Sequence, residues 1–417
     1  MFDLDQWQEI FSTLAKNPLR TFLTAFGVGW GMFMLIVMMG AGNGLENGVS
    51  REFTNVATNS FFLWGQSTSK PYNGFGPGRR MQMNENDYLA IKEQVPNAAT
   101  VAPRNQLNGF QGGNNVIRGA KSGDFEVMGD FPQIKEVEGI DILEGRFLNQ
   151  NDMDQRRKIA VIGTRVQDLL FEPDEDPIGE NIRINGVYFT IVGVFGTRTN
   201  GDRGERDESK IYIPFSTFQR AFNNGNRVGW FAIRSSDGVP ASEVLEDVID
   251  ILKRRHSVAP DDNRAFGNFN LEKQYNQIKG LFGGIRLLVW IVGVGTLIAG
   301  VIGVSNIMLV IVKERTKEIG IRRAIGARPR HIISQILFES ITLTSLAGYV
   351  GLMAGMLSLD AVSALVGENA EMFLNPRVEM SMVYQALAVL VVAGAIAGLI
   401  PARKALAVHP VEALRAD

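Results

Sequence analysis

The chain has 417 residues, of which 45% are hydrophobic and 21% are charged, and its formal net charge is −2. It contains no cysteine, which excludes disulfides and cysteine-based zinc sites. Its three histidines, at 256, 331 and 409, are too far apart in the sequence to suggest a metal site. The near-neutral charge gives no sign of nucleic acid binding, so we expect no nucleic acid partner and no metal.

The charges are segregated along the chain. Four stretches contain no Asp, Glu, Lys or Arg: Thr21 to Leu45, Leu287 to Val312, Ser340 to Leu359 and Met380 to Ala402. Each is long enough to cross about 30 Å of hydrocarbon as a helix. The block between the first two is polar and patterned like a globular domain. The sequence therefore predicts a polytopic α-helical membrane protein with four transmembrane helices and a large mixed α/β extracytoplasmic domain.

The predicted segments follow one another in a simple order. We expect a cytoplasmic amphipathic helix at 1–19, transmembrane helix 1 at 20–45, an α/β domain with stalk helices at 46–284, transmembrane helix 2 at 285–312, a cytoplasmic coupling loop at 313–331, transmembrane helix 3 at 332–359, a short periplasmic loop at 360–379, transmembrane helix 4 at 380–402 and a cytoplasmic tail at 403–417.

The N-terminal segment leaves two questions open. Its apolar residues from Leu4 to Leu14 recur at helical spacing, which fits an amphipathic helix at the inner leaflet or a packed cytoplasmic helix. The first span could be a cleaved signal peptide. Its length exceeds that of a signal core, and the leader is acidic at Asp3, Asp5 and Glu9, so a retained membrane helix is favoured.

Loop charges predict the orientation, because Lys and Arg favour the cytoplasmic side. Basic residues precede the first span, fill the loop 313–331 and follow the last span, whereas the loop 360–379 is mostly acidic. Both termini are expected in the cytoplasm and the large domain outside it. The family resemblance described below implies that the large domain lies in the periplasm and that the chain, in contact with lipid, lies in the cell inner membrane.

The large domain contains several elements with clear local signals. Helices are expected at 84–93, 164–171 and 239–255, and strands at 158–162, 211–214 and 230–233. Asn185-Gly186 lies between two alternating runs and predicts a hairpin over 180–195. The Gly-rich stretches 65–80 and 196–209 are expected to be mobile loops. Helices over 47–54 and 270–281 would form the stalk.

No catalytic motif is present in the chain. A phosphate-binding loop is absent, because the dipeptide Gly-Lys occurs nowhere, and no Gly-x-Ser-x-Gly or His-Glu-x-x-His is found. Small residues recur at four-residue spacing in three spans, as in Gly295–Ala299–Gly303, which predicts close helix packing within or between chains. Glu339, near one end of the third span, is expected to pair with a basic residue of the preceding loop rather than to relay protons.

The loop KERTKEIGIRRAIGARPRH, residues 313–331, contains a short amphipathic helix signal that Gly326 and Pro329 close. A solvated basic loop is one interpretation. Exposed isoleucines at helical spacing favour another, in which a partner docks on this loop.

Several segments resemble the MacB/FtsX-like permeases of ABC transporters, the mechanotransmission type. The most specific are ERTKEIGIRRAIGARPRHIISQILFES and PARKALAVHPVEALR, and KIAVIGTRVQDLLF and DPIGENIRINGVYFTIVGVF resemble the core of the family's periplasmic domain. The resemblance covers nearly the whole chain.

This resemblance implies a homodimer, or a dimer with a similar permease, that binds two ABC ATPase subunits. In MacB itself the ATPase precedes the first span, and only about 17 residues do so here, so a separate ATPase is expected to bind ATP and Mg²⁺ while this chain holds no cofactor. The ATPase-coupling residues would be Glu318, Ile319, Gly320, Ile321, Arg322, Arg323, Ile325 and Gly326.

The expected function is that of the permease subunit, which transmits ATP-driven motion to the periplasmic domain and drives export from the periplasm. A periplasmic adaptor and an outer-membrane duct are further partners that the resemblance suggests. Relatives leave alternatives open: a lipoprotein-releasing permease, or an FtsX-like regulator of a partner such as a cell-wall hydrolase. A membrane-anchored enzyme has no motif in its support.

Overall fold

The computed structural model describes residues 18–54, 56–109, 113–197, 201–366 and 373–406. The chain divides into two compact units: a membrane unit, residues 1–49 and 280–417, and an inserted domain, residues 50–279. Nearly all of the predicted N-terminal amphipathic helix, and the tail from residue 407 onward, lie outside the described residues.

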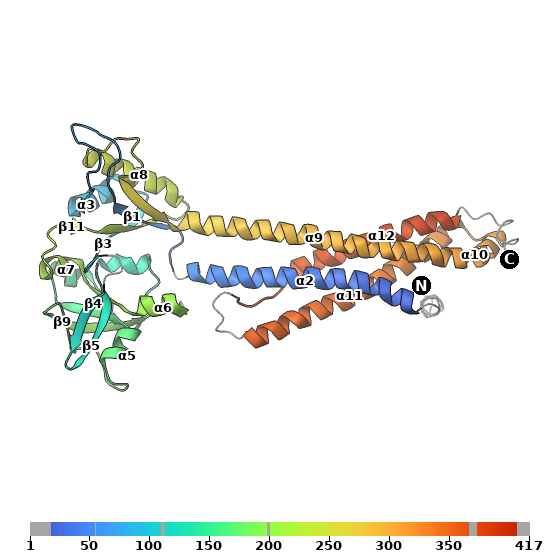
Figure 1. Ribbon diagram of the computed structural model, residues 1–417, viewed down its shortest axis with the longest axis horizontal. Helices are drawn as coiled ribbons and strands as arrows, with labels where there is room; N and C mark the ends of the chain where they lie inside the picture. The colour runs from blue at the N-terminus through green and yellow to red at the C-terminus, as the bar shows by residue number, and fades with distance from the viewer. Residues whose placement is uncertain (1–17, 55, 110–112, 198–200, 367–372, 407–417) are drawn as a thin grey trace. The chain divides into compact units, whose positions relative to one another are not determined.

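The membrane unit contains four long apolar helices: α2 (Pro18–Thr54), α9 (Leu271–Glu314), α11 (Pro329–Val366) and α12 (Met380–Leu406) (Figure 1). All are long and apolar enough to cross a membrane, as the charge-free stretches predicted. The helices α2 and α9 each continue without a break into residues of the inserted domain, where the sequence predicted stalk helices. A short helix, α10 (Thr316–Ala324), connects α9 to α11.

Small residues let the membrane helices approach closely. A Cβ added at Gly351 of α11 would lie 2.0 Å from the carbonyl oxygen of Gly29 in α2, and one at Gly398 of α12 would lie 2.9 Å from Ser340 Oγ. Two of the three predicted ladders therefore pack inside this chain. Gly295 of α9 differs, because a Cβ there would meet nothing within 4 Å.

One half of the inserted domain is an antiparallel sheet in the order β3-β12-β1-β13. Its strands are β1 (Ser60–Gly65), β3 (Ala98–Gln106), β12 (Trp230–Ser235) and β13 (Phe266–Asn270). The helices α3 (Glu85–Gln94) and α8 (Ala241–Arg255) share an apolar core with it, centred on residues such as Phe61, Ile91, Val248 and Phe231. Strand β13 ends the sheet.

The other half is a strongly curved sheet. Its path β10-β7-β9-β8-β4-β5 returns to β10, because β5 and β10 pair in parallel, so these strands form a ring. They are β4 (Asn114–Arg118), β5 (Lys121–Asp130), β7 (Ile159–Gly163), β8 (Asn181–Ile184), β9 (Val187–Gly196) and β10 (Lys210–Pro214), and β6 (Asp141–Gly145) pairs with β9. The ring meets the first sheet where β3 pairs with β5, at Asn105–Gly129 and Gln106–Met128.

The remaining elements are short. They are β2 (Met83–Asn84), which pairs with β11 (Arg227–Val228), a 3-10 helix at Pro132–Glu136, α4 (Gln150–Asp154), α5 (Thr164–Leu170), α6 (Gly201–Glu208) and α7 (Phe215–Ala221). The mixed α/β character predicted for this domain is confirmed.

Local sequence signals placed several elements well. Asn84 caps α3 by accepting the Asn86 N–H at 2.9 Å. Asn185 and Gly186 have φ values of 45° and 87°, the left-handed pair that a tight hairpin turn requires between β8 and β9.

The two stretches expected to be mobile loops have different outcomes: residues 66–80 form no named helix or strand, as expected of a loop, but distant residues contact them, whereas a helix in 196–209 was not expected. In 65–80, the carboxylate of Asp262 accepts the Ser69 and Lys70 N–H groups at 2.7 and 3.1 Å, and Arg79 donates to the Ser257 carbonyl at 2.9 Å. Most of the described part of 196–209 is helix α6. A Gly-rich composition indicates irregular backbone, but it does not show whether distant residues hold that backbone in place.

Candidate functional site

The predicted coupling loop is a helix held between two membrane helices. α9 ends at Glu314, α10 covers Thr316–Ala324, and α11 begins with Pro329, a residue suited to the first turn of a helix. Gly326 has φ 98°, so glycine ends α10 in the left-handed conformation, as the sequence predicted. The observed helix begins two residues earlier than the predicted coupling residues.

The isoleucines of this segment do not share one environment. Ile321 and Ile325 are 41% and 83% exposed, whereas Ile319 is only 9% exposed and belongs to the apolar core of the membrane unit with Ile332 and Ile336 of α11. The expectation that Ile319 is exposed for docking was therefore wrong. Helical spacing shows which residues share a face, but it does not show whether the chain itself covers that face.

The charged residues of α10 also bind the rest of the membrane unit. Arg322 pairs with Glu318 at 2.7 Å and donates to Gln335 of α11 at 2.9 Å. Arg323 donates to the carbonyl of Leu406 in α12 at 2.7 Å. Gly320 is buried beside them. Together with Ile319, these contacts fix α10 to α11 and α12 and leave the side with Ile321 and Ile325 facing outward.

A buried acid completes the junction. Glu339 of α11 is 3% exposed and lies 3.7 Å from Arg315, the residue between α9 and α10. Arg315 also contacts Glu318, at 3.1 Å. This matches the pairing expected for Glu339 with a basic residue of the preceding loop. It also explains how an ionisable group is tolerated in this helix.

The inserted domain contains a buried ion cluster that was not predicted from the sequence. Arg104 of β3 is 2% exposed and binds Asp130 of β5 through two hydrogen bonds of 2.7 and 2.9 Å. It also pairs with Glu138, which accepts the Tyr212 hydroxyl at 2.9 Å. Burial raises the pKa of Asp130 to about 6 despite Arg104. Burial would also raise the pKa of Glu138, but Arg104 and Lys210 lower it to about 2.

This cluster lies where β3 meets β5, so it joins the two halves of the domain. Removing one member of such a buried pair leaves an uncompensated charge and costs about 3–5 kcal/mol. Arg104 is followed by Asn105 and Gln106 at the end of β3, so the sequence neither marks it as buried nor reveals its partners.

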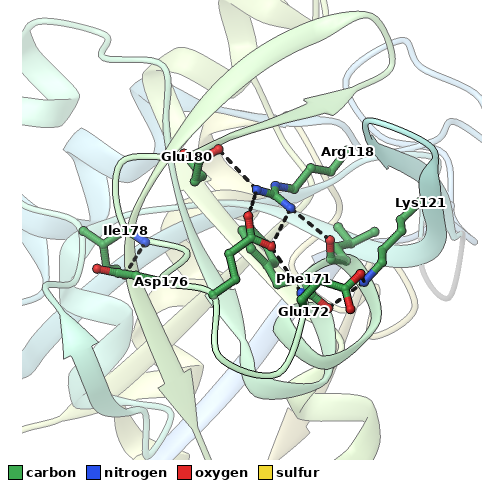
Figure 2. Close-up of polar contacts among 9 residues, drawn as sticks. Arg118, Lys121, Phe171, Glu172, Asp176, Ile178 and Glu180 are labelled. Atoms are coloured by element: carbon green, nitrogen blue, oxygen red, sulfur yellow. Dashed lines mark hydrogen bonds and ion pairs between the residues drawn. The ribbon is translucent and has the colours of Figure 1, made fainter.

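A second cluster fixes the segment after α5 (Figure 2). Arg118 of β4 binds Glu175 at 3.0 Å and Glu180 at 3.3 Å, and its guanidinium lies 4.0 Å from the centre of the Phe171 ring. The hydrogen bonds from Arg118 lower the pKa of Glu175. Lys121 pairs with Glu172 at 2.9 Å. These charges satisfy one another, so the arrangement is structural.

Comparisons with known proteins agree with this architecture. The profile of the MacB-like periplasmic core domain matches residues 21–251, and that of the FtsX-like permease C-terminal domain matches residues 290–410. The chain therefore belongs to the MacB-like and FtsX-like permease family of ABC transporters. Its inserted domain is a MacB-like periplasmic core domain, and its four apolar helices are those of an inner-membrane protein.

Curated relatives match almost the entire chain. A Macrolide export ATP-binding/permease protein MacB from Bdellovibrio bacteriovorus is 30% identical over 407 residues, which cover 97% of this chain and 60% of the relative. A Pyoverdine export ATP-binding/permease protein PvdT from Pseudomonas entomophila is 28% identical over 419 residues, 99% of this chain and 60% of the relative. The chain thus spans about three fifths of the length of these relatives.

Two solved structures are similar to about half of this chain. The periplasmic region of MacB from Actinobacillus actinomycetemcomitans is 22% identical and covers 54% of this chain and 94% of its own, with a TM-score of 0.42. The extracellular domain of the noncanonic ABC-type transporter YknZ from Gram-positive bacteria is 16% identical and covers 51% of this chain and 100% of its own, also with a TM-score of 0.42.

Proposed function

We propose that this chain is the permease subunit of an ABC exporter, in which α10 receives the motion of a separate ABC ATPase and the membrane helices carry that motion to the periplasmic domain. The ATPase supplies ATP and Mg²⁺ binding, and the substrate is extruded from the periplasm. The names of relatives, which describe macrolide and pyoverdine export, support export as the class of function.

One observation carries the proposal: α10 is attached to the bundle on one side and exposes isoleucines on the other. Ile319 and the bonds from Arg322 and Arg323 fix it to α11 and α12. Ile321 of α10 and Ile325, the residue that follows the helix, are about one helical turn apart, and together they form an exposed apolar patch. A force applied to this patch would move α11 and α12 directly, because the packed contacts behind it do not yield easily.

The path from α10 to the periplasmic domain would follow the long helices. α9 begins at Leu271, immediately after β13, and runs to Glu314 beside α10, so a displacement at one end is passed along a single helix. α2 likewise runs unbroken to Thr54. We also propose that the chain acts as a dimer through the outward-facing part of α9, where Gly295 is open and Ile291 and Ile302 are 65% and 55% exposed.

Recovery of the ATPase with variants of the chain tests the coupling role. Fully burying an isoleucine is worth about 1.5–3 kcal/mol, so Ile321→Ala with Ile325→Ala should reduce ATPase co-purification about tenfold or more. The matched control is Val362→Ala with Leu365→Ala, because these residues of α11 have nearly the same exposures, 40% and 86%. Equal recovery with both double variants would contradict the proposal.

A further inference from the structure

One face of α12 is exposed along most of the helix and is apolar. The opposite face, which includes Leu390, Gly394 and Gly398, is buried and packs against α11. From residue 388 to residue 400, every exposed residue of α12 is apolar, and these residues recur at helical spacing: Ala388, Val391, Val392, Ile396, Leu399 and Ile400. One side of α12 therefore belongs to the bundle, and the other side meets whatever surrounds the bundle.

Two cations continue this exposed face at one end. Arg403 and Lys404 are exposed and lie four residues after Leu399 and Ile400, which is about one helical turn along the same face. Tyr384 lies on this face toward its other end, and Lys404 follows it by 20 residues, which is about 30 Å along a helix. This length matches the hydrocarbon thickness of a bilayer, and Tyr and basic residues are typical of its interfaces. The face has the pattern of a lipid-facing surface that ends in cations.

A third exposed cation, Arg330, lies near this pair in the fold. The helices α11 and α12 are antiparallel, and three close contacts have the same register: Gly348 with Leu390, Thr344 with Gly394 and Ser340 with Gly398. Continued toward the end of α12, this register places Arg330 about one helical turn beyond Lys404. We call Arg330, Arg403 and Lys404 the basic corner of the membrane unit.

The basic corner carries positive charge that the described residues do not neutralise. The described acids at this end of the membrane unit already have partners: Glu314, Glu318 and Glu339. Within the part of the chain that the structure describes, Arg330, Arg403 and Lys404 form no ion pair. An anion beside an apolar surface would therefore complement the corner, and an anionic phospholipid combines these two properties.

We propose that the basic corner binds an anionic phospholipid of the cytoplasmic leaflet, with the headgroup phosphate on the three cations and an acyl chain along Leu399 and Ile400. The choice of leaflet rests on the proposed function, in which α10 faces the cytoplasm. A zwitterionic lipid would fit the apolar face equally well, so the cations provide the selectivity.

The position of the lipid gives it a structural role. Arg323 of α10 donates to the carbonyl of Leu406 at 2.7 Å, and Leu406 is two residues after Lys404. A lipid on the basic corner would therefore hold the end of α12 to which α10 is attached.

The test measures which phospholipid contacts this face. The chain has no cysteine, so a fluorescent bimane on Ile396→Cys is a single label on the exposed face, one turn from Ile400. The full chain is reconstituted in phosphatidylcholine vesicles that contain a phospholipid with a nitroxide on its acyl chain, either phosphatidylglycerol or phosphatidylcholine. The relative binding constant obtained from quenching should favour phosphatidylglycerol about fivefold or more, the effect of at least one well-placed cation.

Two double variants separate a site from the general attraction of anionic lipid to a cationic chain. Arg403→Gln with Lys404→Gln should remove the preference. Lys313→Gln with Lys317→Gln should retain it, although this control also removes two exposed cations from the α10 end of the membrane unit. The two variants change the net charge equally, so a difference between them reflects the position of the cations.

Several results would overturn the proposal. These are equal quenching by the two lipids, a preference that survives Arg403→Gln with Lys404→Gln, and an equal loss in the control variant. A disulfide between two copies of the Ile396→Cys chain would assign the exposed face to a second copy. Loss of ATPase recovery with the Arg403 and Lys404 variant, without any lipid preference in the wild type, would assign the cations to the ATPase.

Discussion

The Nη1 atom of Arg315 lies 3.7 Å from the Oε2 atom of Glu339. This ion pair connects the junction of α9 and α10 to the interior of α11, so it holds the proposed coupling helix against the helix that it would move. Arg315 is mostly buried as well, with its side chain 20% exposed.

The first prediction concerns this ion pair. Arg315→Met should destabilise the membrane unit more than Glu339→Gln, because it leaves a buried carboxylate without its cation, whereas the amide is neutral. The double variant should recover part of the loss, with a coupling free energy of about 0.5–3 kcal/mol. Thermal unfolding of the wild type, the two single variants and the double variant in detergent measures this coupling free energy. Strictly additive effects would show that the pair is energetically unimportant.

The second prediction separates the two roles of the isoleucines. Ile319→Ala should lower the unfolding free energy by about 2–5 kcal/mol, since it opens a cavity in the apolar core. Ile325→Ala should leave stability within about 0.5 kcal/mol, because the side chain is exposed. Denaturation of each purified variant checks this. A comparable loss for both would mean that Ile325 is buried within the chain.

The third prediction concerns the glycines of the membrane helices. Gly351→Ala should strongly destabilise the fold, because its Cβ would lie 2.0 Å from the Gly29 carbonyl oxygen. Gly295→Ala should fold normally, since nothing lies within 4 Å of that Cβ. In the proposed dimer, Gly295→Leu should weaken association, which cross-linking in native membranes would detect. Normal folding of Gly351→Ala would contradict the packing of α11 against α2.

The fourth prediction is a pH dependence of the segment 65–80. Burial would raise the pKa of Asp262, but hydrogen bonds from Ser69, Arg264 and Lys70 outweigh it and lower the pKa to about 2. Because the folded pKa lies below the ordinary value of 3.8, the stabilisation is complete above pH 3.8 and is lost as the pH falls toward 2.

A nitroxide on Asn73→Cys, in the segment held by Asp262, reports this loss, and the natural chain has no cysteine that would interfere. The label should become mobile between about pH 4 and pH 2. With Asp262→Asn it should already be mobile at pH 6. A label that stays immobile at pH 2 would show that other contacts hold the segment.

The sequence was most informative where the signal is local or depends on bulk composition. Charge-free stretches identified the membrane helices, and Asn185-Gly186 identified a hairpin, because a bilayer and a tight turn each impose their own chemistry. The same reasoning placed the end of α10 at Gly326. These features need no knowledge of which residues meet in space.

Long-range contacts could not be predicted in this way. The sequence does not show that Arg104 meets Asp130 and Glu138, or that β5 and β10 close a ring, because these pairs lie far apart along the chain. The burial of Ile319 was missed for the same reason. The pattern of α10 identified its apolar residues, but it did not show that Ile319 joins the core of the membrane unit while Ile321 and Ile325 stay exposed.

The most direct test of the coupling proposal is site-specific photocross-linking in native membranes with benzoylphenylalanine at position 325 or 365. Ile325 lies shortly before the first residue of α11, and Leu365 lies next to its last residue. The two side chains are almost equally exposed, at 83% and 86%. We predict a cross-link to the ABC ATPase from position 325 and none from position 365. A cross-link to the ATPase from position 365, or none from 325 while the ATPase is present, would contradict the proposal that α10 carries the coupling.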